Sequence, residues 1–176
     1  MERTSEVYQT VMKRRSCRRF LPDPIPEAHF EMLVQALRWA PSAGNRQPWH
    51  FYVVKNPEIK NRLVAAAYGQ TFLAEAPMVF VICAIPEVSA MRYGSRGREL
   101  YVYQDTAAAV ENLLLTATSL DYGTCWVGAF NEKAVSKVLQ LPEAYRPVAM
   151  VPVGKPAEKP DAPQRRKVEE ILTVLE

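Results

Sequence analysis

Residues 78–85, Met-Val-Phe-Val-Ile-Cys-Ala-Ile, form a nearly continuous apolar run that lies between Pro77 and Pro86. A bounded apolar run of this length, rich in branched side chains, predicts a strand that is buried on both faces. Residues 49–54, Trp-His-Phe-Tyr-Val-Val, predict a second strand. The fold is therefore expected to be built around a sheet whose central strand is the run at 78–85.

Two segments in the C-terminal half predict further strands. Residues 146–153 are mostly apolar but contain Pro147 and Pro152. Because proline donates no ladder hydrogen bond, these prolines place the strand near a sheet edge or at a bulge. A short strand is expected from Thr124 to Gly128. Together, these segments predict a sheet of about four strands.

The longest predicted helix is almost entirely apolar from Ala107 onward, so it must be buried on several sides, in the core or between two subunits. The polar segment from Glu87 to Arg98 predicts a mobile loop. Because no repeat or domain boundary interrupts the pattern, residues 1–176 are expected to form one α+β domain. Helical spacing of apolar residues predicts helices around Val7–Met12, around Phe30–Leu37, from Asn56 to about Tyr68, from about Glu99 to Asp121, and after Asn131.

The net charge of +3 is unevenly distributed along the chain. Residues 13–19 and 164–167 form two islands that hold basic residues and no acidic one, while the remainder has an acidic excess. A protein that binds nucleic acid usually spreads basic residues over one face of its domain. Two short islands instead favour a small polyanion, such as the phosphate of a ligand.

The composition argues against several other classes of protein. No apolar run is long enough to cross a membrane, and residues 1–6 lack the apolar stretch of a signal peptide. Three cysteines without a Cys-x-x-Cys pair are typical of buried thiols, and we expect a cytoplasmic protein. Two histidines, His29 and His50, have no metal-ligand spacing, so no catalytic metal is expected.

The first basic island contains Arg14, Arg15, Ser16 and Arg18 close together in sequence. Their guanidiniums and hydroxyl group are suited to binding a phosphate through charge-assisted hydrogen bonds. The alternative interpretation is a solvated basic patch. Cys17 lies among these cations, which would stabilise a thiolate. We prefer the interpretation that Cys17 only occupies the position between phosphate ligands and has no redox role.

A second motif is the loop at residues 41–49, Pro-Ser-Ala-Gly-Asn-Arg-Gln-Pro-Trp. Its small residues permit close approach of the backbone to a planar ring. Asn45 and Gln47 can donate to and accept from the edge of a heterocycle. The alternative is an ordinary connection between a helix and a strand, with Trp49 entering the core.

In this order and about a helix apart, the two motifs resemble the N-terminal signature of the nitroreductase family. The quoted strings are Arg-Arg-Ser-x-Arg at 14–18 and Ala-Pro-Ser-Ala-Gly-Asn-x-Gln-Pro-Trp-x-Phe at 40–51. The similarity continues in Gln104-Asp105, in Gly-Thr-Cys-Trp-Val-Gly-Ala-Phe at 123–130 and in Val-Pro-Val-Gly-Lys-Pro at 151–156. The resemblance covers essentially the whole chain. It implies a nitroreductase-like α+β fold, with a mainly antiparallel sheet of about four strands flanked by helices and a long central helix at a dimer interface.

The resemblance also implies FMN bound at the interface of a homodimer, with a backbone N–H of Gly128 or Ala129 near the flavin N5. Residues from both subunits are implied in binding it. They are Arg14, Arg15, Ser16 and Arg18 at the phosphate and ribityl chain, Pro41, Ser42, Ala43, Asn45 and Gln47 from the other subunit, Gln70 at the pyrimidine side, Trp126, Val127, Gly128 and Ala129 along the ring, and Arg165 or Arg166 at the phosphate.

By the same resemblance, the protein is expected to take hydride from NADH or NADPH in a ping-pong reaction and reduce nitroaromatics, quinones or similar small electron-poor acceptors. The chemistry belongs to the flavin, so no catalytic side chain is required. Tyr93 is a candidate for stacking on the acceptor, and Arg96 or Arg98 for meeting a nicotinamide phosphate. The alternative for these three residues is a solvent-exposed loop.

Three alternatives for the function stay open. Relatives on this fold dehalogenate, cut a flavin ring or oxidise azolines. A protein that only stores or senses FMN would carry the same binding motifs. A nucleic-acid-binding protein using residues 13–19 is disfavoured by the acidic remainder of the chain. The sequence fixes neither the acceptor nor the choice between NADH and NADPH.

Overall fold

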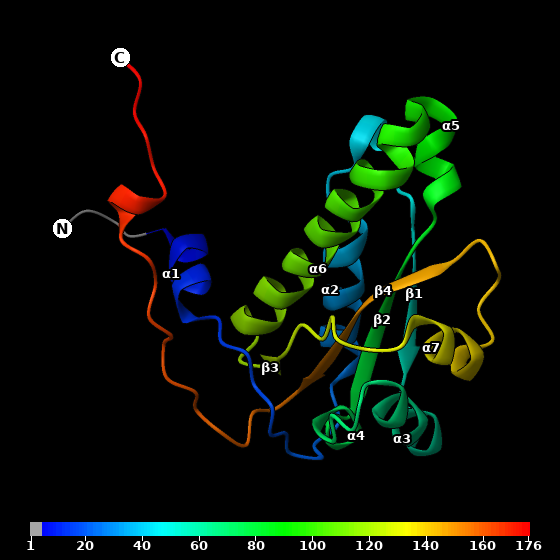
Figure 1. The fold of residues 1–176 in the computed structure, drawn as a ribbon. Helices are drawn as coiled ribbons and strands as arrows, with labels where there is room; N and C mark the ends of the chain where they lie inside the picture. The colour runs from blue at the N-terminus through cyan, green and yellow to red at the C-terminus, as the bar shows by residue number, and fades with distance from the viewer. Residues whose placement is uncertain (1–4) are drawn as a thin grey trace.

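The computed structural model describes residues 5–176, so residues 1–4 of the expected domain lie outside the described residues. A four-stranded antiparallel sheet with the order β1-β2-β4-β3 forms its centre (Figure 1). All seven residues of β2 are buried, which confirms the predicted central strand. The strands are β1 (Trp49–Val54), β2 (Met78–Ala84), β3 (Gly123–Thr124) and β4 (Arg146–Gly154).

Helices cover both faces of this sheet, α2 and α6 on one face and α3, α4 and α7 on the other (Figure 1). The predicted α+β class with about four antiparallel strands and flanking helices is therefore confirmed. The helices are α1 (Glu6–Lys13), α2 (Glu27–Arg38), α3 (Pro57–Ala66), α4 (Phe72–Glu75), α5 (Pro86–Arg96), α6 (Val102–Ser119) and α7 (Glu132–Leu139), with the short turns η1 (Ala43–Asn45), η2 (Gly97–Tyr101, a π-helix) and η3 (Val168–Glu170).

The alternation of side chains along β2 explains why the sheet needs two helical layers. Phe80 and Ile82 point into the core that the sheet shares with α2 and α6. Val79 and Val81 point into the opposite core, against α3, α4 and α7. Because successive residues of a strand face opposite sides, an apolar run without alternation is stable only when both faces are covered.

The long helix α6 lies on the sheet beside α2. Its buried residues recur at helical spacing and face the sheet and α2, and the opposite stripe is half-buried. None of the helices within residues 5–176 is both long enough and apolar enough to cross a bilayer.

Two asparagines mark helix starts as the sequence predicts. The Asn56 side chain accepts hydrogen bonds from the N–H groups of Glu58 and Ile59 at the start of α3. The Asn131 side chain accepts from the N–H of Ala134 in α7. Both side chains satisfy helix N–H groups that have no partner within the helix.

Two sequence predictions need correction. The segment from Glu87 to Arg98 is not a loop but the helix α5 and the start of η2, with a kink at Gly94. Pro86 occupies the first turn of α5, where its missing N–H costs nothing. The strand β4 is not an edge strand, because it lies between β2 and β3, but the expected bulge is present opposite Ile82 and Cys83.

The strand predicted from Thr124 to Gly128 is shorter than expected. Only Gly123–Thr124 pairs continuously with β4, and Val127 then makes an isolated bridge to Met150. The chain therefore leaves the sheet and returns to it once, which exposes the residues on either side of Val127.

Candidate functional site

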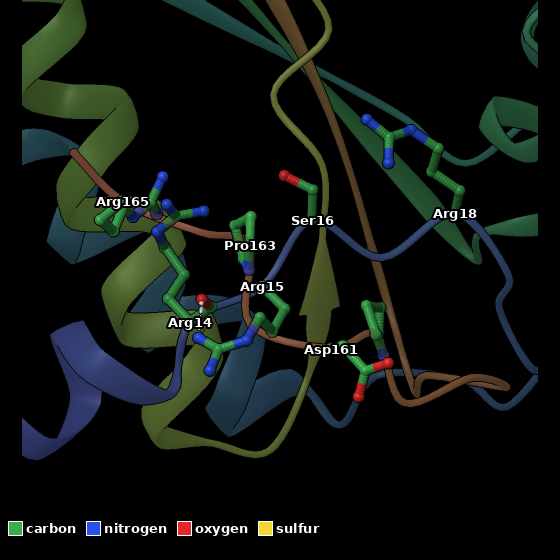
Figure 2. A pocket seen from close by; sticks show the side chains of 8 residues that line it. Arg14, Arg15, Ser16, Arg18, Asp161, Pro163 and Arg165 are labelled. Atoms are coloured by element: carbon green, nitrogen blue, oxygen red, sulfur yellow. Dashed lines mark hydrogen bonds between the residues drawn. The ribbon is translucent and has the colours of Figure 1, made fainter.

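A pocket of about 370 Å³ lies where the segment after α1 passes the C-terminal segment. Its lining carries four guanidinium groups and one carboxylate. Figure 2 shows Arg14, Arg15 and Arg165 on one side of Ser16 and Arg18 on the other. The lining residues are Arg14, Arg15, Ser16, Arg18, Pro160, Asp161, Pro163 and Arg165.

Backbone pairing with β3 fixes this arginine segment in place. Ser16 forms a parallel bridge with Thr124, and the Cys17 N–H donates to the Thr124 carbonyl at 2.8 Å. The Arg18 N–H donates to the Glu158 carboxylate at 2.5 Å, which ties the segment to the C-terminal region. The predicted cluster at residues 14–18 is therefore held in an extended conformation, not on a helix.

The four guanidiniums differ in how many hydrogen bonds and ion pairs they already make within the chain. Arg15 donates to the carbonyls of Met12 and Arg14 at 2.7 and 2.8 Å. Arg14 makes only a long ion pair of 3.8 Å with Glu111. Among residues 5–176, the side chains of Arg18 and Arg165 have no hydrogen-bond or ion-pair partner. Since an unpaired guanidinium is a strong anion ligand, these two and Arg14 are the groups most available to a phosphate.

Arg165 and Arg166 are separated by the structure. Arg165 lines the pocket, whereas the Arg166 guanidinium pairs with the Glu170 carboxylate at 3.2 Å and its backbone carbonyl at 2.9 Å. Of the two alternatives that the sequence leaves open, only Arg165 lies beside Arg14 (Figure 2).

Cys17 is a packing residue in this structure. Its side chain is 2% exposed, and the thiol donates to the Arg19 carbonyl at 3.1 Å. Burial raises the pKa of the Cys17 thiol, so the stabilised thiolate suggested by the neighbouring arginines is wrong. A Cβ at Gly123 would lie 2.8 Å from the Cβ of Cys17, and this close contact explains the glycine.

The segment Trp126–Ala129 follows β3 and presents backbone groups to solvent. Val127 is buried and exchanges hydrogen bonds of 2.9 Å with Met150, so its side chain points into the core. Trp126 is 41% exposed, and a Cβ at Gly128 would meet no atom within 4 Å. Within the described part of the chain, the N–H groups of Gly128 and Ala129 have no acceptor, so they are free to donate to a ligand.

Gln70 lies against this segment. Its side-chain amide donates to the carbonyls of Ala67 and Ala129, at 3.0 and 2.9 Å. Both amide hydrogens are therefore used within the chain, and only the side-chain oxygen remains for a ligand. Gln70 therefore contacts one end of the stretch from Thr124 to Ala129, and the arginine segment pairs with its other end.

The second predicted motif, the loop at 41–47, has an unusual backbone. Gly44, Asn45 and Gln47 have φ values of 55°, 53° and 49°. The Ser42 hydroxyl accepts from the Gln47 N–H at 3.0 Å, and the Gln47 side-chain amide donates to the Asn45 side-chain oxygen at 3.2 Å. Left-handed conformations at non-glycine residues carry strain, so this loop shape is held by specific contacts.

One of those contacts involves Asp105, to which the sequence assigned no role. Asp105 is 6% exposed, and its Oδ1 accepts from the Ala43 N–H at 3.0 Å. Its Oδ2 is buried and, among the described residues, has no partner. Burial raises the pKa of this carboxyl, and the Ala43 hydrogen bond opposes that rise only in part.

Within one chain, the amide loop lies at the N-terminal end of α6, and the arginine segment lies beside the middle and the C-terminal end of the same helix (Figure 1). Asp105 near the N-terminus of α6 holds the 41–47 loop, whereas Lys13 pairs at 2.5 Å with Asp121, just beyond its C-terminus. At 1.5 Å per residue, Asp105 and Asp121 are about 24 Å apart along the axis. Among residues 5–176, no hydrogen bond or ion pair joins the arginine segment to the amide loop.

The predicted substrate residues on α5 and η2 are mostly engaged with other groups. Arg98 forms a bidentate pair with Glu87 at 2.9 and 2.7 Å, and the Arg96 guanidinium donates to the Tyr101 hydroxyl at 2.9 Å. Tyr93 lies directly against Gly44 of the amide loop. Tyr93 is thus placed beside that loop, while Arg98 is neutralised by Glu87.

Comparison with known proteins agrees with these motifs. The profile of the nitroreductase family matches residues 11–71 and 65–155. A protein of Archaeoglobus fulgidus named "Putative NADH dehydrogenase/NAD(P)H nitroreductase" is 35% identical over 89% of this chain and 88% of its own length. A protein of Thermus thermophilus named NADH dehydrogenase is 30% identical over 92% of both chains. The crystal structure of a nitroreductase family protein from Clostridium novyi is 31% identical and superposes with a TM-score of 0.80 over 89% of both chains.

Proposed function

The chain belongs to the nitroreductase family, and on that premise we propose that it is an FMN-dependent oxidoreductase. It takes hydride from NADH or NADPH and then reduces a nitroaromatic, a quinone or a similar electron-poor acceptor in a ping-pong reaction. The proposal treats residues 1–176 as one FMN-binding domain that acts as a cytoplasmic homodimer.

The arginine pocket is the observation that carries this proposal. Three guanidiniums with few or no partners, those of Arg14, Arg18 and Arg165, surround Ser16 in one cavity. Asp161 is the opposing charge in the lining, so the cavity has a net positive charge that suits a phosphate dianion. Phosphate is the charged end of FMN.

The neighbouring segment fits the ring of the same cofactor. Gly128 leaves its backbone open to the approach of a planar group, since even a Cβ there would meet nothing within 4 Å. The free N–H groups of Gly128 and Ala129 can donate to a ring nitrogen, and the Gln70 side-chain oxygen can accept from a ring N–H. Trp126, 41% exposed, flanks this space. The residues present therefore fit a flavin mononucleotide.

When bound, FMN supplies the hydride chemistry, and the protein supplies binding, orientation and electrostatics. The arginines hold the phosphate and so fix the position of the ring. The N–H groups at 128 and 129 stabilise negative charge that develops on the ring during reduction. No side chain of this chain needs to act as nucleophile or general base.

A homodimer is proposed because one subunit holds only half of the predicted site. Asp105 holds the amide loop near the N-terminus of α6, whereas Arg14 and Lys13 pair with Glu111 and Asp121 farther along the chain. We infer that the loop of Pro41, Ser42, Ala43, Asn45 and Gln47 reaches the flavin of a second copy. The exposed apolar residues of α1, among them Tyr8 and Val11, give that copy a surface to cover.

The test is a comparison of the wild-type protein with the double variant Arg14→Ala/Arg18→Ala. Wild-type protein should be yellow with one FMN per subunit, and anaerobic NADH or NADPH should bleach it within seconds. The double variant should keep its circular dichroism spectrum and lose most of its FMN. Retention of stoichiometric FMN would overturn the phosphate assignment. A yellow wild-type protein that neither nicotinamide bleaches would indicate an FMN-storage protein instead.

A further inference from the structure

The surface where α5 meets the amide loop carries a second group of guanidiniums, outside the arginine pocket. They belong to Arg46, Arg92 and Arg96, and within residues 5–176 none of them has a carboxylate at ion-pair distance. Arg46 donates to the Val88 carbonyl at 3.2 Å, and Arg96 is bonded to Tyr101. Arg92 is exposed, and its N–H groups have no acceptor in the described part of the chain.

Contacts with two residues hold the Arg92 side chain in place. The carbon of its guanidinium lies 5.5 Å from the centre of the Tyr93 ring. Its Nη1 lies 3.0 Å from the position that a Cβ of Gly44 would take, and the Tyr93 hydroxyl lies against the same position. Because Gly44 has no side chain, both groups rest on the backbone of the loop that holds Asn45 and Gln47.

Building on the proposed function, we propose that Arg92 binds an anionic group of the substrate. Two sources of that anion share this chemistry: a phosphate of the dinucleotide donor and a carboxylate on the acceptor. Tyr93 supplies the adjacent planar surface. Arg92 thus takes the anion-binding role for which the sequence offered Arg96 or Arg98 as candidates.

The surrounding charges support this assignment. The nearest acidic side chain on α5, Glu87, is neutralised by its bidentate pair with Arg98, and that pairing lowers the pKa of Glu87. Asp105 is buried, and its Oδ1 accepts from the Ala43 N–H of the loop. Among residues 5–176, no carboxylate lies at ion-pair distance from the Arg92 guanidinium, and Arg46 and Arg96 add positive potential around it.

Binding measurements on the purified dimer test the assignment without relying on turnover. Calorimetric titrations with NADP⁺, NAD⁺, 4-nitrobenzoate and nitrobenzene compare wild-type protein with Arg92→Gln. The control is Arg62→Gln, which removes the same charge from the exposed surface of α3. Arg92→Gln should weaken binding of the anion that Arg92 contacts, either the dinucleotide or 4-nitrobenzoate, about tenfold. This is the scale of one charge-assisted hydrogen bond. Nitrobenzene binding and the FMN content should not change.

The outcomes separate the two sources of the anion. If Arg92→Gln weakens binding of NADP⁺ more than binding of NAD⁺, or weakens both equally, Arg92 is assigned to a phosphate of the donor. If Arg92→Gln weakens binding of 4-nitrobenzoate but not of nitrobenzene, Arg92 is assigned to a carboxylate of the acceptor. Unchanged affinities, an equal loss in Arg62→Gln, or a wild-type protein that binds none of the three anions would each overturn the assignment. A wild-type protein without FMN would instead contradict the proposed function. The two failures are distinguishable because the FMN content and the affinity for each anion are measured separately and without turnover.

Discussion

Arg165 and Arg166 are adjacent in sequence and differ in what they touch. Arg165 faces the pocket beside Arg14, whereas Arg166 is paired with Glu170. We predict that Arg165→Ala weakens FMN binding about tenfold, because one charge-assisted contact to the phosphate is lost. Arg166→Ala should leave the FMN dissociation constant unchanged. Fluorescence titration of the apoproteins with FMN measures both constants, and equal losses in the two variants would contradict the placement of Arg165.

Asp105 predicts the direction in which the free energy of unfolding changes with pH. Burial raises the pKa of Asp105, so the folded chain binds its proton more tightly than the unfolded chain. The stability that depends on this group is therefore highest below the ordinary carboxyl pKa, and it falls as pH rises through the folded-state pKa. Asp105→Asn keeps an oxygen for the Ala43 N–H and removes the buried charge.

The free energy of unfolding of Asp105→Asn should exceed that of wild type at pH 7 by about 1 kcal/mol, the scale of burying a polar group without a partner. The difference should shrink as the pH falls through the raised folded-state pKa of Asp105, because wild-type Asp105 then becomes protonated. Urea unfolding at fixed protein concentration measures it, since a dimer's stability depends on concentration. A variant less stable than wild type at pH 7 would show that the second carboxylate oxygen has a partner in the dimer.

Residue types at the candidate site could be predicted from the sequence only where the signal is local. Arg14, Ser16 and Arg18 form one compact string, and the structure places all three in one pocket. The contact of Asp105 with Ala43 and the proposed role of Arg92 beside Gly44 depend on residues more than 40 positions away in sequence. No spacing rule reveals such a contact, so the sequence assigned no role to either residue.

At the scale of elements, α5 and the amide loop are joined through Gly44. Gly44 has a φ of 55°, and a Cβ there would collide with the Tyr93 hydroxyl. Gly44→Ala should therefore destabilise the protein by about 2 kcal/mol, from backbone strain and this collision together. In a Tyr93→Phe background the same substitution should cost less, because the colliding oxygen is absent. Chemical denaturation of the four proteins of this cycle measures the difference, and additive effects would show that the two elements are not in contact.

The misprediction of α5 has a physical explanation. Polar residues and two glycines between 87 and 98 are typical of a loop. In the structure, one of these glycines, Gly97, packs so closely against Ser89 that a Cβ would lie 2.6 Å from its carbonyl oxygen, and Gly94 breaks the helix with φ 56°. The glycines thus mark a tight reversal between two helical segments. By contrast, β1, β2 and the caps at Asn56 and Asn131 depend on neighbours in sequence, and these predictions are confirmed.

At the scale of the whole molecule, the structure leaves apolar surface uncovered where the C-terminal segment runs back past α1 (Figure 1). Exposed apolar side chains of this kind mark an interaction surface more often than a free one. The residues are Val7, Tyr8, Val11 and Met12 on α1, and Val168, Ile171, Leu172, Val174 and Leu175 near the C-terminus. This surface adjoins the arginine pocket, so we propose it as the place where a second copy would bring its amide loop to the arginines.

The proposed arrangement would couple FMN binding to dimerisation, and a matched pair of tyrosines tests that coupling. Tyr8 on α1 and Tyr68 between α3 and α4 are 57% and 72% exposed, so replacing either by aspartate should leave the fold of one subunit intact. Tyr8→Asp should shift sedimentation toward the monomer and reduce FMN occupancy several-fold, although every pocket arginine is retained. Tyr68→Asp should remain dimeric. A monomeric Tyr8→Asp protein that still holds FMN as tightly as wild type would mean that the arginine half of the site is sufficient, because the loop of a second subunit would then contribute no binding energy.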